Sequence, residues 1–136
     1  MNPVVHFEMP DDDRARMARF YETAFGWQTQ MFGPEMGNYV TAATAESGPD
    51  GRPVQPGTIN GGFYPRNPEW PAQVPSVVIA VDDIQAAMKQ VALSGGTVLG
   101  EPMEIPGVGH YVSFMDTENN RVSLLQPLPR AGQPAA

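Results

Sequence analysis

HFEMPDDD (residues 6–13) and SVVIAVDD (residues 76–83) lie seventy residues apart and share one pattern, an apolar strand that ends in acidic residues. Each stretch is followed by a run with helical spacing of its apolar residues, and the two runs stop at Gly26 and Gly96. The paired aspartates stand where an acidic side chain caps and stabilises the first turn of a helix. This repetition predicts a duplicated strand–helix unit.

The remainder of each half is predicted to add three strands. In the first half, a helix with an apolar stripe at Met17, Phe20, Tyr21 and Ala24 precedes strands over 27–32, 38–43 and 58–64. In the second half, a helix with its stripe at Ile84, Ala87, Met88 and Val91 precedes strands over 97–100, 110–115 and 121–126. We therefore expect an α+β fold of two βαβββ modules.

The length of the chain and the positions of its glycines and prolines suggest how the modules are organised. We expect a first module over 1–70, a second over 71–127, and a disordered tail over 128–136. A chain of 136 residues suits one structural domain rather than two independent ones, so the modules should share a core.

Composition excludes several classes of function. The formal net charge of −7 and the pI near 4.6 argue against nucleic acid and anionic membranes as partners. There is no cysteine, which removes disulfides, thiolate zinc sites and cysteine nucleophiles. The start of the chain lacks the features of a signal peptide, and no apolar run approaches the roughly 20 residues that span a bilayer. We expect a cytoplasmic protein.

Five motifs, taken in their order and spacing, resemble the vicinal oxygen chelate superfamily of glyoxalase I, bleomycin resistance proteins and extradiol dioxygenases. They are His6 fourteen positions before Phe20-Tyr21, then FGW (25–27), VDDIQAA (81–87), GGTV (95–98) and FMDTENN (114–120). The resemblance implies an open, cup-shaped mixed sheet around a ligand, with the helices on its convex side. It also implies a homodimer.

The resemblance places the metal ligands of metal-dependent members at three positions of this chain. They fall on His6, on Ser76 and on Ser123, where the family pattern has a glutamate at the last position. Serine hydroxyls are poor ligands for a divalent transition metal, which prefers imidazole, carboxylate or thiolate. We therefore predict no metal and no cofactor at this site.

The candidate ligand-binding residues are polar side chains at or near the expected cup. His6 and Glu8 are two apart in a strand, so both face one side and could act as an acid–base pair. An alternative is that they form a structural hydrogen-bonded pair. The full candidate set comprises His6, Glu8, Asn60, Ser76, His110 and Ser123.

Two residues of that set have further alternatives. His110 could reach the ligand from the rim or lie on the surface, and a metal shared by His6 and His110 with Glu8 or Glu104 is a further possibility. Asn60 stands beside Gly61 and Gly62, which could make room for a substrate or simply allow close packing of backbones.

Three functions remain open at this stage. The first is a protein that binds a small organic molecule without a catalytic metal. The second is a metal-independent lyase or isomerase that uses His6 and Glu8. The third is a metal-dependent lyase or dioxygenase with substituted ligands. The sequence does not identify the ligand.

Overall fold

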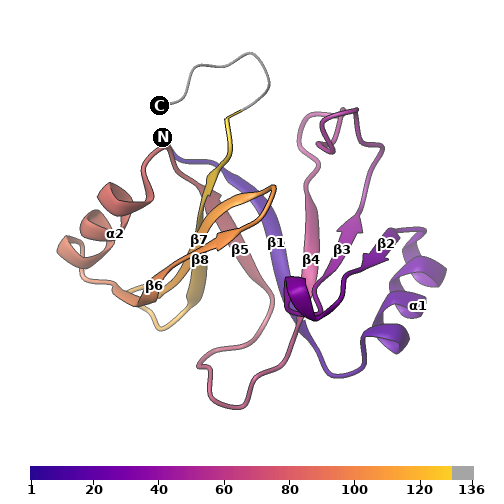
Figure 1. The fold of residues 1–136 in the computed structure, drawn as a ribbon, viewed down its shortest axis with the longest axis horizontal. Coiled ribbons are helices and arrows are strands. Elements are labelled where there is room, and N and C mark those ends of the chain that lie inside the picture. The colour runs from indigo at the N-terminus through magenta and orange to yellow at the C-terminus, as the bar shows by residue number, and fades with distance from the viewer. Residues whose placement is uncertain (130–136) are drawn as a thin grey trace. The chain divides into compact units, whose positions relative to one another are not determined.

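The computed structural model describes residues 1–129 and has the predicted α+β class. The elements follow the order strand, helix, three strands, twice over (Figure 1). The first set comprises β1 (Val4–Asp11), α1 (Arg14–Phe25), β2 (Gln28–Met31), β3 (Val40–Ala43) and β4 (Asn60–Pro65), with a short 3-10 helix at Pro34–Met36. The second comprises β5 (Ser76–Ala80), α2 (Ile84–Leu93), β6 (Thr97–Ile105), β7 (Gly109–Met115) and β8 (Arg121–Pro127).

The chain divides into two compact units. One is Val5–Pro75, which we call the N-terminal module; the other, the C-terminal module, joins Met1–Val4 to the chain from Ser76 onward. The first residues belong to the second unit because Ala80 N donates a hydrogen bond to Pro3 O at 2.9 Å. Residues 130–136 of the predicted tail lie outside the described residues.

Each module is a four-stranded mixed sheet with one helix. The hydrogen-bonded strand order is β2-β3-β4-β1 in the N-terminal module and β6-β7-β8-β5 in the C-terminal module. In both, the first strand pairs in parallel with the last and the other pairings are antiparallel. The two βαβββ modules predicted from the repeat are confirmed.

The helix caps explain why the two acidic stretches begin helices. The side chains of Asp13 and Asp83 accept hydrogen bonds from the backbone N–H groups of Arg16 and Ala86, each at 3.0 Å. Gly26 ends α1 in the left-handed conformation at φ 72°.

α2 ends at Leu93, just before the Gly95-Gly96 pair, and Gly95 has a positive φ of 100°. Gly96 is needed for a different reason, since an added Cβ would lie 2.8 Å from Val91 Cγ1 and 2.9 Å from Met115 O.

Each helix buries one stripe against its own sheet. The apolar cluster of the N-terminal module comprises Val40, Ala42 and Phe63 with Phe7, Met9, Met17, Tyr21 and Trp27 packed on it. The predicted stripe of α1 was partly wrong, because Phe20 is 51% exposed and Ala18 is buried instead. In the C-terminal module the cluster is Val81, Ile84, Val112, Phe114 and Leu124, and Ala87, Met88 and Val91 of α2 pack on it.

Two strands are longer than the sequence indicates. β1 continues past Pro10 to Asp11, whose carbonyl accepts a hydrogen bond from Arg66 N at 2.9 Å. β6 continues past Gly100 to Ile105 because its register with β7 shifts between Leu99 and Met103, after which pairing resumes. A β-bulge of this kind absorbs residues that would otherwise end a strand.

Candidate polar site on the sheet faces away from the helices

In the N-terminal module, His6, Tyr39 and Glu8 form one hydrogen-bonded chain. His6 Nε2 lies 2.9 Å from the Tyr39 hydroxyl, and that hydroxyl donates to Glu8 Oε2 at 3.0 Å. His6 and Glu8 alternate along β1 with Phe7 and Met9, which belong to the helix-side cluster. The three polar groups therefore share the sheet face opposite α1.

Glycines let the tyrosine lie flat on the sheet. A Cβ at Gly62 would lie 2.1 Å from the Tyr39 hydroxyl, and a Cβ at Gly61 would lie 2.3 Å from the Phe7 ring. The two glycines thus accept one aromatic ring on each face of β4. Close packing, rather than open room for a substrate, accounts for this pair.

Burial sets the protonation state of the histidine. Desolvation lowers the pKa of His6 from 6.5 to about 4, so the imidazole is neutral at pH 7. Tyrosine has a single hydroxyl proton, which goes to Glu8 here. The Tyr39 oxygen can then bond His6 only as an acceptor, so Nε2 carries the ring proton and Nδ1 keeps its lone pair. Glu8 itself is only 6% exposed.

The C-terminal module carries a second polar cluster at the equivalent place. Ser123 Oγ lies 2.7 Å from the Tyr111 hydroxyl and 3.0 Å from Ser113 Oγ. Arg121 also reaches Ser113 Oγ, at 3.5 Å. Ser123 is only 2% exposed, so its hydroxyl is committed to these partners.

Ser76 belongs to the same face of its sheet. It lies two residues before Val78, which pairs with Ser123 across the parallel ladder. Residues paired across a ladder, and residues two apart in a strand, face one side.

The other two candidates lie elsewhere. His110 alternates with Tyr111 and therefore faces the α2 side, where it lines a cleft of about 450 Å³ with Ile84 and Gln85. The structure does not bring it to the face that carries Ser123.

Asn60 pairs with His6 in the ladder, but its side chain holds the loop between β3 and β4. Its Oδ1 accepts from Thr44 N at 3.1 Å, and its Nδ2 donates to Ser47 Oγ at 3.1 Å and to Gly51 O at 3.3 Å. These hydrogen bonds anchor the loop.

Tyr39 and Tyr111 belong to the two polar clusters, although the candidate set of polar residues did not include them. Strand pairing makes them equivalent: Val40 pairs with Phe63 as Val112 pairs with Leu124, and each tyrosine directly precedes its valine. The signal was present as a second repeat, NYVTA at 38–42 and HYVSF at 110–114.

The metal positions do not fit a transition metal. Of the three donors, only His6 offers a nitrogen, and Ser123 offers a neutral hydroxyl already bonded at 2.7 and 3.0 Å. Among residues 1–129, no three His, Asp or Glu side chains gather as a metal site.

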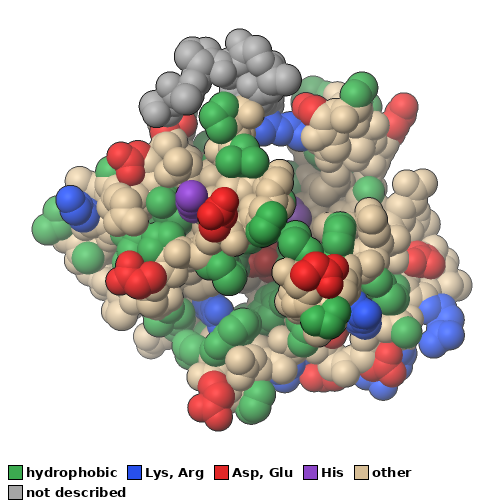
Figure 2. Space-filling model, in the orientation of Figure 1, with side chains coloured by type: hydrophobic (Ala, Val, Ile, Leu, Met, Phe, Trp, Pro, Cys, Tyr) green, Lys and Arg blue, Asp and Glu red, His purple; other side chains and the backbone are tan. Residues whose placement is uncertain are grey.

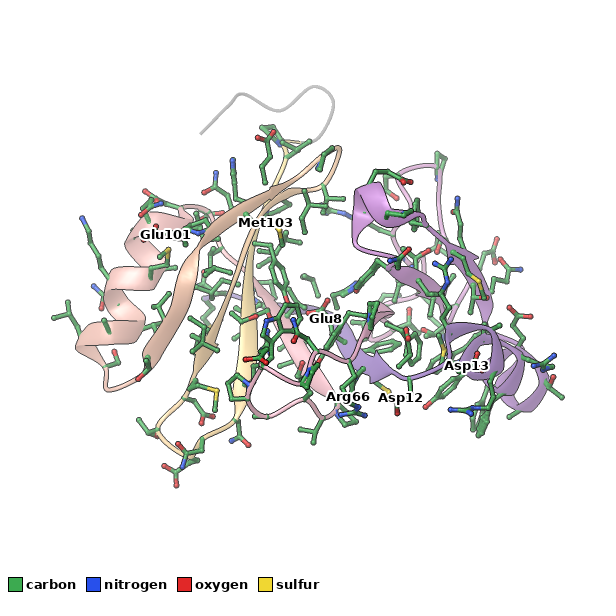
Figure 3. The ribbon with its side chains drawn as sticks, turned by 60° about the horizontal axis from the view of Figure 1, so that its bottom comes forward. Glu8, Asp12, Asp13, Arg66, Glu101 and Met103 are labelled. Carbon is green, nitrogen blue, oxygen red and sulfur yellow. The ribbon has the colours of Figure 1, made fainter. Side chains whose placement is uncertain are left out.

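Two charged side chains pair where β1 and β4 end, apart from the cluster. Figure 3 shows Glu8 on β1, and Asp12 beside Arg66 where β1 and β4 end. Asp12 and Arg66 form an ion pair at 3.0 Å between half-exposed side chains, which contributes little to stability. On the face drawn in Figure 2, acidic side chains are scattered rather than gathered in one patch.

Comparison with known proteins agrees with the resemblance found in the sequence. The family model of the Glyoxalase/Bleomycin resistance protein/Dioxygenase superfamily matches residues 4–124. The chain belongs to this superfamily. The predicted resemblance is confirmed, and this superfamily membership accounts for the duplicated module.

Two curated superfamily relatives illustrate the range. The anthracycline biosynthesis protein DnrV of Streptomyces peucetius is 34% identical in an alignment 122 residues long, which covers 81% of this chain and 42% of that protein. A glyoxylase-like domain-containing protein of Didymella fabae is 31% identical in an alignment 116 residues long, which covers 83% of this chain and 84% of that protein. The chain spans 39% to 42% of the length of four curated relatives from Mycobacterium and Streptomyces.

Solved structures that are similar in fold include ones more distant in sequence. Methylmalonyl-CoA epimerase from Mycobacterium tuberculosis superposes with a TM-score of 0.64 at 13% identity, covering 94% of this chain and 89% of that chain. A likeness at this identity concerns the fold. Within residues 1–129, no helix has the length and apolar character needed to cross a membrane.

Proposed function

We propose that this superfamily member binds a small organic molecule at the His6–Tyr39–Glu8 chain without a catalytic metal. The observation that carries the proposal is the hydrogen-bonded chain itself, with His6 Nε2 2.9 Å from the Tyr39 hydroxyl and that hydroxyl 3.0 Å from Glu8 Oε2. A few polar groups set among apolar side chains are the usual form of a small-molecule site.

The pKa of His6 favours binding over acid–base chemistry. A catalytic base works best when its pKa lies near the operating pH, and the pKa of His6 is about 4. At pH 7 such an imidazole is a hydrogen-bonding group more than a proton acceptor. Its Nδ1 lone pair offers an acceptor for a ligand hydroxyl or amide.

A metal-independent lyase or isomerase is the second candidate. It is favoured by the direction of the hydrogen bonds, which run from His6 Nε2 through the Tyr39 hydroxyl to Glu8. When His6 Nδ1 accepts a proton from a ligand, Nε2 can pass its proton to Tyr39, and Tyr39 can pass its own to Glu8. Such a relay needs a ligand that raises the pKa of His6 when it binds. Exchange of a ligand C–H proton with solvent deuterium, abolished in Tyr39→Phe, would identify it.

The test of the first candidate is a thermal-shift screen on protein whose metal content has been measured. We expect less than a tenth of an equivalent of transition metal and stabilisation by some members of a library of neutral, cationic and anionic metabolites and antibiotics. A stabilising ligand that acts only after stoichiometric Zn²⁺, Ni²⁺ or Fe²⁺ is added would contradict the proposal.

A further inference from the structure

A second concave feature lies entirely within the C-terminal module. It is a groove of about 710 Å³ between α2 and the sheet face that this helix covers. Its floor is apolar and its helix-side wall comes from α2. The floor comprises Ile79, Val81, Phe114 and Leu124. The wall is formed by Ala86, Ala87, Gln90 and Val91.

The internal repeat shows what fills the same space in the N-terminal module. Strand pairing fixes the correspondence, because Met9 pairs with Phe63 as Ile79 pairs with Leu124. The capping aspartates fix it for the helices, which makes Tyr21 equivalent to Val91.

The N-terminal module fills this space with rings. Tyr21 stacks on Trp27 with ring centroids 4.6 Å apart and planes at 12°, and it lies 5.3 Å from the Phe63 ring. At the equivalent positions the C-terminal module has Val91, Gly96 and Leu124. Loss of ring volume from a close-packed interface leaves open space.

Other exchanges close this space only in part. The C-terminal module has Phe114 where the N-terminal module has Ala42, which adds a ring. It has Ala87 where the N-terminal module has Met17, which opens the helix side. The groove therefore lies where the N-terminal module has its aromatic cluster of Tyr21, Trp27 and Phe63, and it lacks the rings of that cluster.

The rim of the groove is acidic. Asp82 and Asp83 lie where α2 begins, and Asp116 lies beyond the end of β7. Asp116 accepts hydrogen bonds from the N–H groups of Glu118 and Asn120, both at 2.8 Å, which hold its carboxylate in place. Among the described residues that line the groove there is no lysine or arginine. Carboxylates at an apolar groove attract cations and repel anions.

We propose that this groove is a binding site for an aromatic organic cation. The ring system lies in the groove beside Val91 and Gly96, at the position that corresponds to Trp27 of the N-terminal module, and the amino group points to Asp82 at the start of α2. The site uses none of the His6–Tyr39–Glu8 residues, so it stands or falls independently of the function proposed above.

The experiment compares three probes with one ring system: 2-naphthylmethylamine, 2-naphthylmethanol and 2-naphthoate. Binding is followed by two-dimensional NMR of the full chain. We expect the amine to shift amide signals of α2 and β5, the alcohol to bind more weakly and the carboxylate not to bind. Asp82→Asn should weaken the amine about two- to fivefold, as for one exposed charge pair, and leave the alcohol unchanged.

The matched variants test the position of the ring. Val91→Tyr restores the residue of the N-terminal module and should weaken the amine at least tenfold, whereas Ala92→Tyr, on the exposed side of α2, should not. Ala87→Met is the second filling variant if Val91→Tyr fails to fold. Equal binding of amine and carboxylate, shifts confined to the N-terminal module, unchanged affinity in a folded filling variant, or no binding of the amine would each overturn the proposal.

Discussion

Acid should destabilise the protein through His6. The folded state lowers the pKa of this imidazole from 6.5 to about 4, because burial disfavours the charged form. The unfolded chain therefore binds more protons than the folded chain between about pH 6.5 and pH 4, and the free energy of unfolding falls as the pH falls through this window. One pKa unit corresponds to about 1.4 kcal/mol. Because His6 is partly exposed, the loss in free energy of unfolding that it causes is about 2–3 kcal/mol.

Urea unfolding at pH 7, 6, 5 and 4 measures this loss. The matched variants are His6→Gln, which removes the titrating group, and His110→Gln, which removes the other histidine. We expect the difference in free energy of unfolding between wild type and His6→Gln to change by about 2–3 kcal/mol across the series. His110→Gln controls for the exchange of a histidine for a glutamine. Parallel curves for wild type and His6→Gln would refute the account of a buried neutral imidazole.

Three further outcomes follow from the packing and the caps. Gly62→Ala should displace Tyr39, raise the pKa of His6 toward 6.5 and destabilise the fold by about 1–3 kcal/mol. Gly61→Ala should destabilise the fold through Phe7 without moving the pKa of His6. NMR titration of His6 separates the two variants. Asp83→Ala should lower the free energy of unfolding by about 1 kcal/mol through loss of the bond to Ala86 N, and Asp82→Ala should change it less in the same chemical denaturation series. Light scattering at micromolar concentration should show a homodimer, and a monomer there would oppose that expectation.

The architecture could be predicted because its signals are local. Asp13 and Asp83 cap helices through their own side chains, and Gly26 ends α1 through its own φ angle, so the residue type at one position suffices. The strand β6 could not be bounded in this way. Gly100 and Pro102 normally end a strand, and only the pairing partner β7 allows a bulge to absorb them.

The site was predictable in part. Alternation along one strand places His6 and Glu8 together, and the structure joins them. The residue that joins them, Tyr39, directly precedes a different strand, β3, and its place depends on the glycine at position 62 beneath its ring. His110 and Ser123 were grouped from family position and residue type, whereas the alternation of β7 places them on opposite faces.

The central claim is tested most directly by isothermal titration of metal-free protein with the ligand that the thermal-shift screen yields. We expect near one-to-one binding by wild type and a loss of about 1–3 kcal/mol in His6→Ala, because a buried hydrogen-bond partner is left unsatisfied. His110→Ala, folded to the same extent, should bind as wild type does. If His6→Ala binds the ligand unchanged, or binding appears only with a divalent metal, the account is contradicted.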